Sequence, residues 1–104
     1  MIPAIVVGCM DYRFQEKIQN LITKNNLSYG DYDLVLIQGG AGNFEQLKQH
    51  LITAKTLHDP QLIILTIHED CGYGSKKNYF NKSMEICRNI FGENIQIIME
   101  YLTL

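Results

Sequence analysis

The sequence lacks two features that would assign it to large classes of protein, a long apolar run and an excess of positive charge. No apolar run approaches the roughly 20 residues of a membrane-spanning helix, so we expect no membrane partner. Nine basic and eleven acidic side chains give a net charge of −2, so the composition does not indicate a nucleic-acid partner. Met1 leads directly into strand-like sequence without a basic segment or a cleavage site, so we expect no secretory signal.

Cysteine is also scarce, with three residues among 104. An odd and small number of cysteines argues against a disulfide framework and for a reducing compartment, so we expect a cytoplasmic protein. Gly39, Gly40 and Gly42 do not complete either G-x-x-x-x-G-K-[ST] or G-x-G-x-x-G, so they indicate nucleotide binding only weakly. A close approach of this loop to a neighbouring site explains these glycines better.

The remaining sequence is typical of one globular domain that spans residues 1–104, with 46% hydrophobic and 19% charged residues. Four apolar segments predict buried strands, at 2–7, 33–38, 62–67 and 95–101. The three intervening segments carry apolar residues at helical spacing. In chain order, the buried faces of these helices are expected to comprise Phe14, Ile18, Leu21 and Ile22; then Phe44, Leu47, Leu51 and Ala54; then Phe80, Met84, Cys87, Ile90 and Phe91. Asn43 is expected to cap the second helix, Ser75 or Asn78 to open the third, and Gly92 to end it.

This alternation of strands and helices predicts an α/β fold, with a parallel sheet of about four strands and helices on both faces. We expect the strand order 2-1-3-4. In that order the carboxyl ends of the first and third strands are neighbours, at the point where the strand order reverses. Open α/β sheets bind their ligands at this point.

Two thiols and an imidazole follow these two strands. Cys9 comes after the first strand, and His68 and Cys71 come after the third. Two thiolates and a neutral imidazole suit zinc, and three protein ligands leave a fourth position open, as in catalytic zinc sites. Taken singly, each cysteine is better explained as a small buried hydrophobe and His68 as a core histidine. The coincidence of spacing, strand-end position and ligand type favours zinc. Cys87 is expected to pack in the core, and His50 and His58 to be solvated.

Asp11 and Arg13 lie two residues apart, just past the first strand. They can form an ion pair, and Asp11 can equally cap the helix that follows. A positioned Asp11 can orient the reacting water while Arg13 holds its carboxylate away from the metal. If Arg13 released Asp11, that carboxylate could become the fourth zinc ligand and close the site. The sequence leaves both arrangements open.

The pattern Cys-x-Asp-x-Arg followed by His-x-x-Cys-Gly resembles the motif pair of the β-class carbonic anhydrases, over about residues 2–74. The resemblance implies reversible hydration of carbon dioxide to bicarbonate by a hydroxide on Zn²⁺. It implies that Cys9, His68 and Cys71 are the ligands and that Asp11 and Arg13 are catalytic. It also places a substrate-site loop at Gly39, Gly40, Ala41 and Gly42.

The chain departs from the family pattern at two points. Many β-class enzymes carry Arg-Asn where this chain has Gly39-Gly40, and the N-terminal helical arm of typical members is not present in the sequence. The alternatives are hydrolysis of COS or CS₂, and a non-catalytic zinc-binding or bicarbonate-sensing module closed by Asp11. A cysteine phosphatase is excluded, because Cys9-x₃-Arg13 is shorter than the C-x₅-R loop of those enzymes. Two open sheet edges and uncovered helix surface also predict a homodimer or a higher homo-oligomer.

Overall fold

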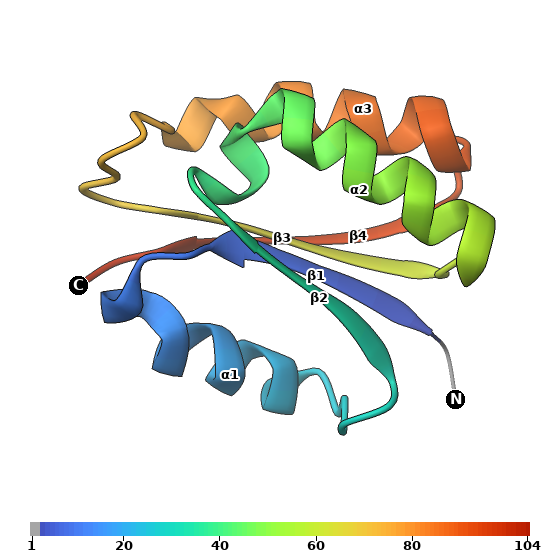
Figure 1. Ribbon diagram of the computed structural model, residues 1–104, viewed down its shortest axis with the longest axis horizontal. Helices are drawn as coiled ribbons and strands as arrows, with labels where there is room; N and C mark the ends of the chain where they lie inside the picture. Colours follow the sequence, from blue (N-terminus) through green and yellow to red (C-terminus); the bar gives the residue numbers. More distant parts are fainter. Residues whose placement is uncertain (1–2) are drawn as a thin grey trace.

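Four parallel strands form one sheet, and helices cover both of its faces (Figure 1). The structure is a computed structural model, which describes residues 3–104. The strand order is β2-β1-β3-β4, as predicted. The strands are β1 (Ala4–Cys9), β2 (Tyr32–Ile37), β3 (Leu62–His68) and β4 (Gln96–Leu102), and the helices are α1 (Gln15–Lys24), α2 (Phe44–Leu57) and α3 (Phe80–Phe91). Within residues 3–104, none of the helices combines the length and the apolarity needed to span a bilayer.

The two central strands extend one or two residues further than the sequence predicted. Cys9 still pairs with Ile37, and His68 still pairs with Leu102, so each is the last residue of its strand rather than the first residue of a loop. The apolar runs end earlier because Gly8 follows Val7 and the polar His68 follows Ile67, whereas backbone pairing continues through Cys9 and His68. The predicted start of β1 at Ile2 lies outside the described residues.

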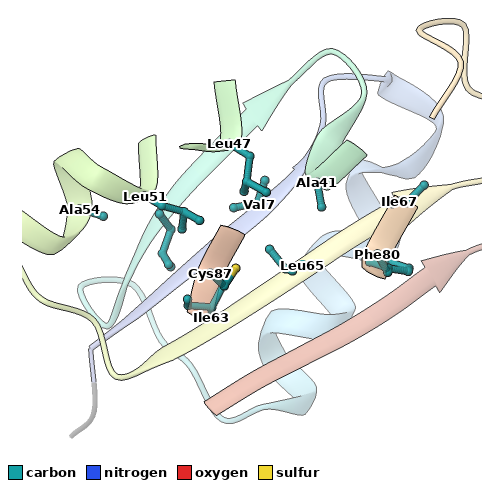
Figure 2. Close-up of a cluster of buried hydrophobic side chains, with 11 residues drawn as sticks. Val7, Ala41, Leu47, Leu51, Ala54, Ile63, Leu65, Ile67, Phe80 and Cys87 are labelled. Carbon is teal, nitrogen blue, oxygen red and sulfur yellow. The ribbon is translucent and has the colours of Figure 1, made fainter. Parts of the chain in front are cut away.

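The apolar core has one part on each side of the sheet. Figure 2 shows the part between the sheet and helices α2 and α3, where Leu47 and Leu51 of α2 belong to one buried cluster with Ile63 and Leu65 of β3. On the other face α1 contributes Ile18, Leu21 and Ile22. Because every residue of β1 and β3 is buried, these two strands are a rigid base for whatever lies at their ends.

The helix ends agree with the sequence at α2 and at the end of α3, and differ at the start of α3. Asn43 accepts a hydrogen bond from the backbone N–H of Gln46 and so caps α2, and Gly92 ends α3 with φ of 98°. Neither Ser75 nor Asn78 caps the third helix. Ser75 instead donates its hydroxyl hydrogen to the carbonyl of Gly39, 2.8 Å away. A short 3₁₀ turn, Lys77–Tyr79, precedes α3. Met84 is only half-buried, and Ser83 takes the fully buried position instead.

Candidate metal centre

The ends of β1 and β3 bring three potential metal ligands together. The ligand atoms of Cys9, His68 and Cys71 all lie within 4.8 Å of one another. Cys9 and His68 are buried and Cys71 is half-buried in the loop that follows β3. The neighbouring positions of β1 and β3 in the sheet are the reason that residues about sixty positions apart in the chain meet here. All three cysteines of the chain are free thiols.

The His68 ring is held so that one nitrogen remains available. Its Nδ1 lies 2.6 Å from the carbonyl oxygen of Glu69. Because a carbonyl only accepts, Nδ1 carries the hydrogen and Nε2 keeps its lone pair. Nε2 is buried and has no hydrogen-bond partner among residues 3–104. Leaving a buried polar atom unpaired costs about 1–3 kcal/mol. A metal ion on Nε2 would remove that cost.

The phenyl ring of Phe14 fixes the plane of this imidazole. The two rings stack with centroids 4.1 Å apart and an interplanar angle of 19°. Phe14 is fully buried in the short 3₁₀ turn Tyr12–Phe14 that joins β1 to α1. The helical spacing of apolar residues predicts only that Phe14 lies in the core. Its contact with His68 spans 54 positions in the chain (68 − 14) and has no local sequence signal.

Asp11 and Arg13 form a close ion pair, and Asp11 also caps the 3₁₀ turn. Its Oδ1 accepts a hydrogen bond from the backbone N–H of Arg13 at 3.0 Å, and Nη2 of Arg13 donates to its Oδ2 at 2.7 Å. The ion pair considered from the sequence is therefore present, whereas the cap lies on the 3₁₀ turn rather than on α1, which begins without a side-chain cap. Asp11 Oδ2 lies 3.8 Å from Nε2 of His68, which places the carboxylate at the rim of the ligand group.

The Arg13 side chain and backbone N–H lower the pKa of Asp11 from 3.8 to about 2, because both donate hydrogen bonds to the carboxylate. The same ion pair raises the pKa of Arg13 above its already high value. Asp11 is therefore a carboxylate throughout the neutral range. The pKa of Asp11 is lower in the folded chain than in the unfolded chain. The Asp11–Arg13 pair therefore contributes fully to the stability of the fold above pH 3.8, and this contribution is lost as the pH falls toward 2.

An open cleft of about 730 Å³ lies beside these residues. Its walls come from the loops after β1, β2 and β3, and comprise Cys9, Met10, Asp11, Tyr12, Arg13, Gln38, Gly39, Gly72 and Tyr73. All four residues of the glycine-rich segment are buried, and of these Gly39 lines the cleft whereas Gly40, Ala41 and Gly42 do not. The ring of Tyr73 packs on Gly39, where a Cβ would come within 2.4 Å of it. The predicted role of this loop in substrate binding stays a prediction.

Gly40 is the position at which the glycine-rich loop packs against the backbone of the two central strands. Its φ is 55°, and a Cβ there would lie 2.7 Å from the Thr66 carbonyl oxygen and 3.1 Å from the Cys9 nitrogen. Both neighbours are backbone atoms of central strands, so they cannot move away easily.

We expect Gly40→Ala to lower the free energy of unfolding by about 1–2 kcal/mol from the left-handed backbone alone, with the steric overlap adding to it. Urea denaturation of the metal-free protein measures this change. Gly30→Ala is the matched control, because Gly30 also has a positive φ, of 93°, but a Cβ there meets nothing within 4 Å. Equal stability of the two variants would contradict the assigned packing.

The remaining thiol and the other two histidines lie outside this group. Cys87 is fully buried in the core, and burial raises the pKa of its thiol to about 12, so it is an inert packing residue. His58 is exposed at the end of α2, where Nδ1 lies 2.7 Å from a carboxylate oxygen of Asp33. His50 is half-buried. The expectation that both are simply solvated was therefore incomplete.

The comparisons with known proteins identify the fold. No protein-family model matches the sequence, and no curated protein matches it. Among solved structures, carbonic anhydrase from Streptococcus mutans is similar with a TM-score of 0.65 and 16% identity, covering 96% of this chain and 75% of that one. Carbonic anhydrase from Glaciozyma antarctica is similar with a TM-score of 0.54 and 16% identity, covering 99% and 78%. The chain thus has the α/β fold of these carbonic anhydrases.

Proposed function

We propose that this protein is a zinc-dependent, carbonic anhydrase-like enzyme that interconverts carbon dioxide and bicarbonate. One observation supports this above all others. The ligand atoms of Cys9, His68 and Cys71 converge within 4.8 Å, and the buried Nε2 of His68 has no hydrogen-bond partner among the described residues. This convergence occurs in a chain with the fold of carbonic anhydrases.

The donor set fits zinc rather than a harder cation. Two thiolates and one imidazole nitrogen match the preferences of Zn²⁺, and three ligands leave room for a small molecule at the fourth position. When bound, zinc would lower the pKa of a water ligand and so supply a nucleophile at neutral pH. Glu69 and Phe14 act on His68 from outside, the first by fixing its tautomer and the second by fixing the plane of its ring.

Asp11 is proposed to orient the reacting water. The Oδ2 atom of Asp11 lies near the ligand group. A carboxylate can only accept a hydrogen bond, so the water must direct a hydrogen toward Asp11, and its lone pair is thereby left to point toward the substrate. Arg13 holds this carboxylate with Nε and Nη2, at 2.7–3.3 Å. The guanidinium therefore acts through Asp11 rather than on the substrate.

The lining of the cleft suits a small substrate but does not favour one small molecule over another. Apart from the Asp11–Arg13 pair and the proposed ligand Cys9, the lining residues carry no charged side chain, and Gly39 contributes only backbone, on which the Tyr73 ring packs. Carbon dioxide, COS and CS₂ are all small, linear and uncharged. Hydrolysis of COS or CS₂ by the same residues is therefore the variant of the proposal to be tested beside it.

The second candidate is a non-catalytic zinc-binding or bicarbonate-sensing module. The distance of 3.8 Å between Asp11 Oδ2 and Nε2 of His68 favours it, because a modest movement would bring the carboxylate into the ligand group. Against it stands the network of hydrogen bonds from Arg13, which such a movement would break.

The deciding experiment combines metal analysis of the purified protein with stopped-flow CO₂ hydration. The enzyme proposal expects about one zinc per chain and hydration well above the buffer rate. COS and CS₂ are assayed in parallel. One zinc per chain with no turnover of any of the three would favour the closed module, and a protein that binds no zinc would overturn both candidates.

We also propose that the protein is a homodimer or a higher homo-oligomer. Strands β2 and β4 are the edges of the sheet, and Leu34 and Leu36 on β2 remain 42% and 37% exposed. Open edges with exposed apolar side chains are surfaces that a second copy can cover. Light scattering at micromolar concentration should give at least twice the chain mass of 12.0 kDa, and a mass of one chain would contradict this.

A further inference from the structure

Arg13 contacts a second acidic residue that the proposed chemistry does not use. Its Nη1 donates to Oδ2 of Asp70 at 3.1 Å, and its Nη2 donates to the backbone carbonyl of Asp70, also at 3.1 Å. Asp70 immediately precedes Cys71, and Asp11 follows Cys9 by two residues. One guanidinium therefore joins the loop after β1 to the loop after β3.

The backbone of Asp70 is shaped for this contact. Its φ is 53°, a left-handed conformation that few residues other than glycine adopt and that aspartate tolerates. Both the carboxylate and the carbonyl of Asp70 reach the same guanidinium. Within the loop the Gly74 N–H donates to the Cys71 carbonyl at 2.9 Å. The Asp70 side chain is 75% exposed and the Cβ positions of Gly72 and Gly74 face open space, so little side-chain packing holds the loop here.

We propose that Asp70 is a positioning residue that, through Arg13, holds Cys71 in place for metal binding. The inference rests on the proposed zinc site and concerns how that site is pre-formed. On its other side Cys71 is restrained by Ser75, whose hydroxyl donates to the carbonyl of Gly39. The loop is thus held on both sides of Cys71. Before it, the Glu69 N–H donates to the Leu102 carbonyl at 2.9 Å, and the Arg13–Asp70 contact is the restraint nearest to Cys71 on that side.

The chain offers a matched control in Asp59. It too has a positive φ, of 46°, an exposed side chain and a basic partner, Lys55, at 3.2 Å. Asp59 lies just past α2 and does not belong to the ligand group. Asparagine tolerates the same backbone conformation. Asp70→Asn and Asp59→Asn therefore remove one exposed charge each, and only the first removes it beside the metal ligands.

We expect Asp70→Asn to weaken zinc binding about threefold to tenfold, between the effect of an exposed ion pair and that of a buried outer-shell partner. Competition with a chromogenic chelator measures this dissociation constant. In the metal-free protein, alkylation of Cys71 by iodoacetamide, located by mass spectrometry, should be several times faster than in the wild type. Asp59→Asn should change neither quantity.

A double-mutant cycle separates the contact from a general loss of negative charge. If Asp70 acts through Arg13, Asp70→Asn should have no further effect on zinc affinity in an Arg13→Ala background. An undiminished effect there would overturn the proposal, as would wild-type zinc affinity in Asp70→Asn alone. Wild-type protein that binds no zinc would instead overturn the proposed function on which the inference rests.

Discussion

Cys71→Ser should lose zinc almost completely, with an affinity at least about a hundredfold below that of the wild type. A serine hydroxyl stays protonated at neutral pH and is a poor zinc ligand, so the site keeps one thiolate and one imidazole. Under the proposed assignment zinc binds the folded chain, so its loss would also remove the stability that it adds. The variant should therefore melt where metal-free wild-type protein melts. Metal analysis after dialysis and thermal denaturation with and without zinc measure both effects.

Cys87→Ser is the matched control for this experiment. Cys87 is fully buried in the core between the sheet and α3, away from the ligand group, so serine there leaves a buried hydroxyl (Figure 2). This substitution should destabilise the protein by about 1–3 kcal/mol and leave one zinc per chain. Full zinc occupancy in Cys71→Ser, or loss of zinc in Cys87→Ser, would show that the ligands are assigned wrongly.

Asp11→Asn should leave zinc bound and lower CO₂ hydration about ten- to hundredfold, as the loss of a positioned orienting group usually does. Asparagine keeps an oxygen that can accept the backbone N–H of Arg13 at 3.0 Å, so the cap and the fold survive. It loses the charge that fixes the water and binds the guanidinium. Stopped-flow kinetics and zinc content, measured on the same preparation, separate the two effects.

Asp33→Asn controls for the loss of a carboxylate that contacts a basic side chain. Asp33 also contacts a basic side chain at 2.7 Å, that of His58, and takes no part in the metal centre. It should hydrate CO₂ at the wild-type rate. If Asp11→Asn does so too, Asp11 is only a helix cap. Arg13→Ala should differ from both, because it frees the carboxylate to enter the ligand group and so closes the site.

The fold could be predicted from sequence because its signals are local and strong. The apolar runs before Cys9 and His68 are long enough for strands and are interrupted by polar helical segments, and this alternation constrains the strand order. Once the order is fixed, the meeting of Cys9 with His68 and Cys71 follows from the topology. Identity of only 16% to carbonic anhydrases of similar fold shows that few residues are needed to carry this pattern.

The contacts around the ligands could not be predicted in the same way. The stacking of Phe14 on His68, the two bonds from Arg13 to Asp70 and the bond from Ser75 to Gly39 all join distant parts of the chain. Each involves a residue type with a commoner local use, as core, loop or helix cap. The positive φ of Asp70 has no sequence signature either, because aspartate occurs in many backbone conformations.

The position of β1 at the centre of the sheet has a consequence for the order of events during synthesis. This strand is made before the other three, yet it lies between β2 and β3, and β3 begins 58 residues after it (62 − 4). Pairings between strands so far apart in sequence form slowly, and unpaired apolar strands tend to aggregate. Until β3 has left the ribosome, the nascent chain therefore exposes a strand that is buried throughout in the finished sheet. A chaperone that shields Ala4–Cys9 during this interval would raise the yield of folded protein more than one that acts on the completed chain.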